Sequence, residues 1–151
     1  MNIATLDSPI GRIGIAERDG RIVRLLWTAE DEGERNMVLD AGIAQLSQYF
    51  AGTLDAFDLP LDPGGSAFQR QVYAEMQAIP RGETRTYGDI ANALGVMAQP
   101  VGQACGSNPI PIIIPCHRVV GRDGLGGFSA PEGIEMKVKL LRLEGAYSLL
   151  I

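Results

Sequence analysis

This chain of 151 residues contains only one histidine and two cysteines. A structural zinc site takes four Cys or His ligands, so these three side chains fall short of such a set, and we expect no metal. The same scarcity argues against a disulfide framework. The length suits one or two small domains, each with a core of its own.

Long apolar runs are also missing. No stretch approaches the roughly 20 residues of a membrane-spanning helix. The start, at residues 1–5, lacks the basic residues and long apolar stretch of a signal peptide. The sequence therefore predicts a cytoplasmic protein without a membrane anchor, and in that reducing compartment both cysteines are expected to be free thiols.

Lysine is absent from residues 1–62, which hold five Arg and eleven acidic residues, a net charge of −6. Residues 63–151 hold eight Lys or Arg and seven acidic residues, a net charge of +1. Cations for a polyanionic partner would therefore come from the second part. An acidic protein with local charge fluctuation explains the same numbers. So few cations predict a small phosphate footprint and modest, salt-sensitive binding.

Residues 1–62 are expected to form a small domain of antiparallel strands and one helix. Asp19-Gly20 joins two alternating segments, 13–16 and 22–26, in the manner of a β-hairpin turn. Thr28 and Asp31 resemble a capping box for a helix that ends near Gly52. A short strand is expected at 57–61. The inner face of the helix should carry four apolar residues: Ile43, Leu46, Tyr49 and Phe50.

Residues 63–151 are expected to be mainly helical, after a linker at 62–65. Ser66 and Gln69 form a second capping box, for a helix that Pro80 stops. Further helices are predicted at 87–94 and 99–106, with Gly95 between them, and at 131–143. The two short helices fit either a helix-turn-helix or an ordinary helical hairpin. The apolar face of the first of these helices is Phe68, Val72, Tyr73, Met76 and Ile79.

The single histidine directly follows a cysteine, in the run Asn-Pro-Ile-Pro-Ile-Ile-Ile-Pro-Cys-His-Arg at 108–118. A thiolate is a strong nucleophile, and histidine is its usual proton acceptor. In an extended segment Cys116 and His117 would point to opposite faces, so a water between them is the simplest relay. Glu144, at the end of the last helix, is the candidate partner behind His117. A buried, inert cysteine is the alternative.

This run, together with Thr-Tyr-Gly-Asp-Ile-Ala at 86–91, resembles the O6-alkylguanine-DNA alkyltransferases, or methylated-DNA–protein-cysteine methyltransferases. The resemblance covers roughly residues 66 to 146, and residues 1–62 are similar only in layout. It implies an α+β (α/β-like) fold: an RNase H-like N-terminal domain of antiparallel sheet plus helix, then a mainly helical, winged-helix-like domain with a helix-turn-helix. The expected domains are 1–62 and 63–151.

The resemblance implies that the chain repairs double-stranded DNA that carries O6-alkylguanine. Cys116 would accept the alkyl group from an extruded guanine, once per chain and without a cofactor, and O4-alkylthymine would be a second substrate. The protein is expected to act as a monomer. The residues implied in catalysis are Cys116, His117, Glu144 and Asn108. Those implied in base binding are Tyr87, Val119, Phe128 and Ser129. Those expected to contact DNA are Gln99, Pro100, Gly102, Gln103, Gly106 and Arg118.

Two positions depart from the family pattern. Gln99 stands where the family usually has an arginine that fills the space left by the base, and Phe128 stands where many members have Tyr. We therefore expect weaker DNA binding or slower base extrusion than in an arginine-bearing relative. Two rival functions remain: a non-catalytic lesion-binding protein that flags damage for excision repair, and a cysteine hydrolase or thiol oxidoreductase. Cys105, eleven residues before Cys116, is interpreted as a small buried apolar side chain.

Overall fold

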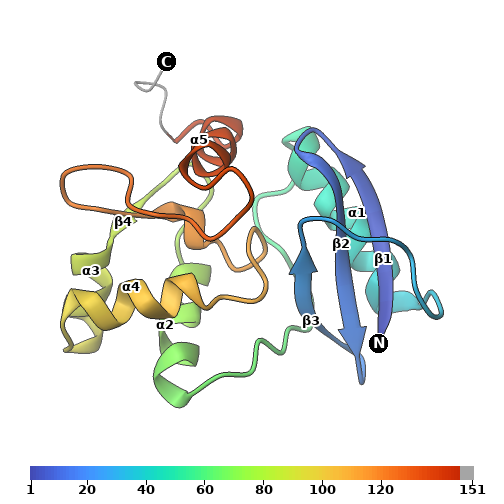
Figure 1. Ribbon diagram of the computed structural model, residues 1–151, viewed down its shortest axis with the longest axis horizontal. Coiled ribbons are helices and arrows are strands. Elements are labelled where there is room, and N and C mark those ends of the chain that lie inside the picture. The colour runs from blue at the N-terminus through green and yellow to red at the C-terminus, as the bar shows by residue number, and fades with distance from the viewer. Residues whose placement is uncertain (147–151) are drawn as a thin grey trace. The chain divides into compact units, whose positions relative to one another are not determined.

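The computed structural model describes residues 1–146, which divide into two compact units at Gly64–Gly65. Figure 1 traces the chain from the sheet of the first unit to the helices of the second. None of the helices in this part of the chain is both long and apolar enough to cross a membrane.

The first unit is an antiparallel sheet with the order β1-β2-β3, with helix α1 packed against it (Figure 1). The strands are β1 (Asn2–Ser8), β2 (Gly11–Arg18) and β3 (Arg21–Leu26). Asp19 and Gly20 both have positive φ, 54° and 80°, as a two-residue type I′ turn requires, so the predicted hairpin is confirmed. Gly42 lets α1 (Met37–Ala51) approach the sheet, because a Cβ there would lie 2.3 Å from Ile15 Cδ1.

Two predicted elements of this unit are wrong. The helix begins after Asn36, whose side chain accepts from the Leu39 N–H, and not at Thr28. Asp31 accepts instead from the N–H and hydroxyl of Thr5, so it is not available as a cap. Residues 57–61 form no strand. A single bridge joins Leu61 to β3, and Pro60, which has no N–H, cannot extend it into a ladder.

The core of the first unit lies between the sheet and α1. On the helix, Leu46 and Tyr49 are buried as predicted, whereas Ile43 and Phe50 are half-buried. The strands contribute branched aliphatic side chains that exclude water from the other side. Fully buried members of this core are Ile13, Ile15, Ile22, Leu39 and Leu46.

The second unit contains α2 (Ala67–Gln77), α3 (Tyr87–Leu94), α4 (Ala98–Gly106) and α5 (Ile134–Leu143). Both capping boxes in this unit, at Ser66 and at Thr86, are present. Gly95 ends α3 with φ 69° and starts the tight turn into α4, so the two predicted short helices with a glycine between them are present. The predicted start of the last helix is wrong, since Glu132 and Gly133 have φ of 69° and 55° and cannot be helical.

Two very short strands connect the helix-turn-helix to the cysteine segment. β4 (Arg85–Thr86) pairs in parallel with β5 (Val119–Val120), so that Thr86 lies opposite Val120. α3 begins immediately after β4, and a short 3-10 helix, η1 (Cys116–Arg118), immediately precedes β5. The pairing therefore brings the first residue of α3, Tyr87, toward the segment that carries Cys116.

Candidate active site

Cys116 begins a single 3-10 turn, not the extended segment predicted from its branched neighbours. Pro115 has φ −82° and ψ 69°, and its carbonyl accepts from the Arg118 N–H at 3.0 Å, which closes the turn. Successive side chains of a 3-10 helix diverge by about 120°. Cys116 and His117 therefore still point in different directions, as expected, but through a turn and not through strand alternation.

Asn108 fixes the segment that leads to the turn. Its Nδ2 donates to the Ile114 carbonyl at 2.8 Å, and its Oδ1 accepts from the Ile110 N–H at 3.0 Å. The Cys116 N–H donates to the same Ile114 carbonyl at 2.8 Å. Asn108 follows directly on the C-cap residue of α4. One buried side chain thus ties the end of α4 to the backbone beside the cysteine.

His117 is completely buried and faces the end of α5. Its Nε2 lies 2.7 Å from Oε2 of Glu144, so the predicted contact between these two side chains is present. Nδ1 of His117 is also buried and has no hydrogen-bonding partner among the described residues. A neutral ring that donates from Nε2 to the carboxylate leaves Nδ1 as a proton acceptor.

The burial of these groups decides their ionisation. Burial lowers the pKa of His117, against the opposing effect of Glu144, so the ring is neutral near pH 7. Burial would raise the pKa of Glu144, but hydrogen bonds and charges of His117 and Arg118 hold it at about 2. Burial raises the pKa of the Cys116 thiol to about 11, so its ionisation at neutral pH needs a base.

Arg118 is buried, which is at odds with its predicted contact with DNA. Its Nε and Nη2 donate to the two carboxylate oxygens of Glu144 at 2.9 and 3.0 Å, and its Nη1 donates to the Ile79 carbonyl at 2.6 Å. The side chain is only 8% exposed. A guanidinium engaged in this way is not available to phosphate, so we withdraw Arg118 from the set of DNA-contacting residues.

Lys137 is a buried cation that the sequence interpretation missed. Its Nζ donates to the carbonyls of Val119 and Gly127 at 2.7 and 3.1 Å, and lies 5.7 Å from the centre of the Tyr87 ring. Burial lowers the pKa of Lys137 to about 8, against the raising effect of the two thiols. The signal was present in the sequence: Lys137 shares the inner face of α5 with Leu140, Leu141 and Glu144, at helical spacing.

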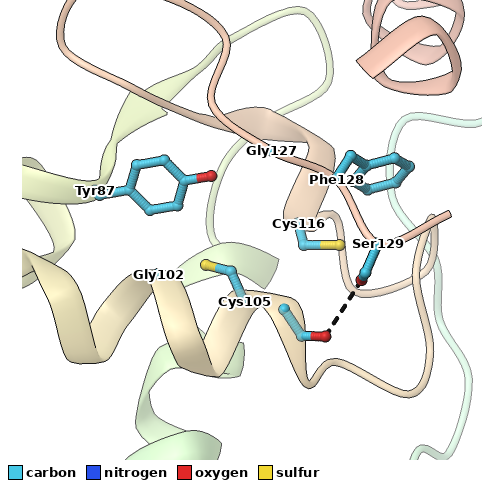
Figure 2. A pocket seen from close by; sticks show the side chains of 8 residues that line it. Tyr87, Gly102, Cys105, Cys116, Gly127, Phe128 and Ser129 are labelled. Atoms are coloured by element: carbon cyan, nitrogen blue, oxygen red, sulfur yellow. Dashed lines mark hydrogen bonds between the residues drawn. The ribbon is translucent and has the colours of Figure 1, made fainter. Parts of the chain in front are cut away.

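Cys116 opens into a cavity of about 420 Å³, large enough for a nucleobase. Figure 2 shows the Tyr87 hydroxyl and the sulfurs of Cys105 and Cys116 directed into the space between α4 and the loop at 127–129. The Ser129 hydroxyl donates to the Gly106 carbonyl at 3.2 Å. The residues around the cavity are Tyr87, Gly102, Cys105, Gly106, Cys116, Gly127, Phe128 and Ser129.

The pocket therefore contains three of the four residues predicted to bind the base: Tyr87, Phe128 and Ser129. Val119 is buried and does not line the cavity, and its carbonyl accepts from Lys137. Cys105 is buried, as expected for a small apolar side chain, and its thiol lies 3.7 Å from the Met76 sulfur. It nevertheless lines the pocket, which sequence reasoning did not predict.

Tyr87 is held close to the loop by a glycine. A Cβ on Gly126 would lie 2.9 Å from the Tyr87 hydroxyl oxygen, and Gly126 has φ +73°, so this contact depends on glycine. Burial raises the pKa of Tyr87 to about 12. The phenol is therefore protonated at neutral pH and can donate a hydrogen bond into the pocket.

α4 forms one wall of the pocket and also carries the remaining residues predicted to contact DNA. Gly102 and Gly106 line the cavity, and a Cβ at either position would meet nothing within 4 Å. Gln99, Pro100 and Gln103 are exposed. The helix thus presents a small, uncharged surface beside the cavity, and its N-cap, Met97, makes no side-chain capping hydrogen bond.

The fold and the site together define a class: a protein in which a buried thiol, backed by imidazole and carboxylate, opens beside a helix-turn-helix. Residues 1–63 match the 6-O-methylguanine DNA methyltransferase ribonuclease-like domain. Residues 67–146 match the DNA-binding domain of the same family. The chain belongs to the 6-O-methylguanine DNA methyltransferase family.

Individual relatives agree over nearly the whole chain. The methylated-DNA–protein-cysteine methyltransferase of Mycolicibacterium paratuberculosis is 44% identical, over 95% of this chain and 92% of the relative. The constitutive enzyme of Bacillus subtilis is 38% identical, over 93% of each. The Mycobacterium tuberculosis O6-methylguanine methyltransferase crystal structure gives a TM-score of 0.84 at 39% identity, over 96% of this chain and 93% of that one. The M. tuberculosis OGT structure in complex with DNA gives 0.83 at 39% identity, over 97% and 94%.

Proposed function

We propose that the protein repairs double-stranded DNA by transferring an alkyl group, typically methyl, from O6 of guanine to Cys116. The observation that carries this proposal is the position of the Cys116 thiol, inside a base-sized pocket and next to the His117–Glu144 pair. Family membership supplies the reaction class. The relative from M. tuberculosis solved with DNA supports DNA as the partner.

The proposed reaction is a single displacement at the alkyl carbon. His117 accepts the thiol proton through Nδ1, by way of one water, and Glu144 stabilises the resulting imidazolium. The sulfur then forms a bond to the alkyl carbon as the carbon–oxygen bond breaks. Guanine leaves with one proton, which balances the proton that the thiol lost, so no co-reactant is needed. The protonated phenol of Tyr87 is a suitable donor to the departing base.

The product limits the protein to one turnover. A thioether is stable in water, and the proposed mechanism includes no step that hydrolyses it. The reaction is therefore stoichiometric, and no cofactor takes part because the cysteine itself is the acceptor. O4-alkylthymine is a second substrate in this proposal, and the cytoplasmic location and monomeric state predicted from the sequence stay predictions.

The target carbon is inaccessible in stacked duplex DNA, so the nucleotide must be extruded into the pocket. We assign the duplex contact to α4, with Gln99, Pro100, Gly102, Gln103 and Gly106 as the contacting residues. Small side chains permit close approach to a groove, and minor-groove readout is degenerate, which suits a protein that must scan every sequence. DNA binding and alkyl transfer thereby belong to residues 63–151, and residues 1–62 form a separate domain.

Two cysteine variants test the acceptor. A duplex with a radiolabelled O6-methylguanine should transfer its label to wild-type protein and to Cys105→Ser, and not to Cys116→Ser. All three proteins should bind the duplex with similar affinity. Label on Cys116→Ser would place the acceptor elsewhere. Lesion-selective binding by the wild type without any transfer would support the rival lesion-binding function, and turnover beyond one equivalent would support a hydrolase.

A further inference from the structure

Arg118 joins three elements of the second unit at a point that the solvent hardly reaches. It belongs to η1, its guanidinium binds both oxygens of the Glu144 carboxylate at the end of α5, and it also donates to the Ile79 carbonyl just after α2. A bidentate pair of this kind fixes the plane of the carboxylate as well as its position. The same carboxylate accepts from His117 at 2.7 Å.

We infer that Arg118 is a positioning residue of the acceptor site: it fixes Glu144 against His117, and its charge adds to the effect of burial in keeping the imidazole neutral and able to accept a proton. This inference rests on the proposed function, in which His117 takes the thiol proton. It replaces the predicted DNA contact of Arg118 with a task inside the protein.

The geometric part follows from the carboxylate's freedom. Glu144 is the C-cap residue of α5, where the backbone provides no further helical turn to hold it. A single hydrogen bond to His117 does not by itself fix the plane of the carboxylate, because the group can rotate about its last torsion. The two parallel hydrogen bonds from Arg118 remove that rotation, because they occupy one lone pair on each oxygen.

The charge part follows from the sum of the buried ions. The groups that act on the imidazole are Glu144, Arg118 and Lys137, with Cys116 as the titratable neighbour on the same turn. Glu144 favours the protonated ring, whereas the two cations disfavour it. Removing Arg118 takes away one of the two cations that disfavour the protonated ring, so the imidazole would take up a proton at higher pH. A protonated ring cannot accept the thiol proton.

The single histidine makes this inference directly measurable, because every imidazole signal in the spectrum of the untagged protein belongs to His117. Nitrogen-15 NMR reports both its tautomer and its pKa. In the wild type we expect the neutral ring to carry its proton on Nε2. We also expect it to stay neutral at pH values below the ordinary histidine pKa. In Arg118→Met, which keeps much of the volume and removes the charge, the pKa should rise by about one to three units.

Two further variants separate charge from geometry. Arg118→Lys restores the charge without the fork, so the pKa of His117 should stay near that of the wild type while transfer is still slower. Lys139→Met removes a different cation of α5, one that forms an exposed ion pair with Glu132. This variant should leave both the pKa of His117 and the transfer rate unchanged. If Arg118→Met fails to fold, Arg118→Gln takes its place, because it too lacks the charge but can still donate to the carboxylate.

The pH dependence of single-turnover transfer completes the test. The acid limb of the rate profile should move to higher pH in Arg118→Met, together with the NMR pKa. An unchanged His117 pKa in a folded, charge-removing variant overturns the inference, as does a rate that falls equally at all pH values. Loss of DNA affinity with a weaker salt dependence would restore the DNA contact. If the wild type itself transfers nothing, the proposed function fails, but the NMR titration still decides the role of Arg118.

Discussion

Asn108→Ala should destabilise the segment that carries Cys116, and it also removes a side-chain hydrogen bond that lowers the pKa of the Cys116 thiol. The substitution removes two buried hydrogen bonds to backbone groups, one to the Ile114 carbonyl and one from the Ile110 N–H. The two backbone groups differ in whether another hydrogen-bonding partner remains after the substitution. The Ile114 carbonyl keeps the Cys116 N–H as a donor at 2.8 Å, whereas the Ile110 N–H loses the acceptor that Asn108 provides.

This difference sets the magnitude. A hydrogen bond lost where another remains costs about 0.5–1.5 kcal/mol, and a buried donor left unsatisfied costs about 1–3 kcal/mol. The free energy of unfolding should therefore fall by roughly 1.5–4.5 kcal/mol, which is large against the usual effect of about 1 kcal/mol. Transfer should also slow, because the turn at Cys116 is no longer tied to the end of α4.

Far-UV circular dichroism during urea unfolding, combined with hydrogen exchange of peptides across 108–118, measures this loss. The fluorescence of the only tryptophan, Trp27, reports on the first unit and would miss it. Asn92→Ala is a matched control, since it is the same change of side chain at an exposed position of α3. A change of less than about 0.5 kcal/mol in Asn108→Ala, comparable to a surface substitution, would refute the reasoning.

Three further predictions concern the pocket, the buried imidazole and the DNA surface. Gly126→Ala should slow transfer about tenfold or more, because its Cβ would displace Tyr87, whereas Gly124→Ala meets nothing within 4 Å and should be silent; equal rates for the two would contradict this. Because the folded pKa of His117 is lowered, stability should be complete above about pH 6.5 and decline below it by up to 1.4 kcal/mol per pH unit. A flat urea midpoint between about pH 5 and 6.5 would count against the buried neutral ring. Gln99→Arg should raise DNA affinity or the transfer rate, with a steeper salt dependence, and no change in either would end that idea.

Local side-chain chemistry made much of the fold predictable. The boxes at Ser66 and Thr86 were recognisable because each cap and its partner lie three residues apart and depend on nothing distant. The same pattern at Thr28 and Asp31 failed because Asp31 binds Thr5, 26 residues away. Nothing in a short window distinguishes the two cases.

The site divides in the same way. Cys116 and His117 were found by adjacency, and Glu144 by its place at the end of a helix. Arg118 is the next residue after Cys116-His117, but the direction of its side chain could not be predicted. That direction depends on the Ile79 carbonyl, which lies beside Arg118 only because α2 packs against η1. Lys137 could have been recognised from its place on the apolar face of α5, because a lysine is rarely buried unless its charge has partners.

The central claim is that Cys116 is the alkyl acceptor, and intact-mass spectrometry with peptide mapping tests it most directly. After incubation with excess duplex containing O6-methylguanine, the account predicts one added methyl group per chain, located on Cys116, with no further gain on longer incubation. An unmodified chain that still binds the lesion, or a methyl group mapped to Cys105 or any other residue, would contradict it.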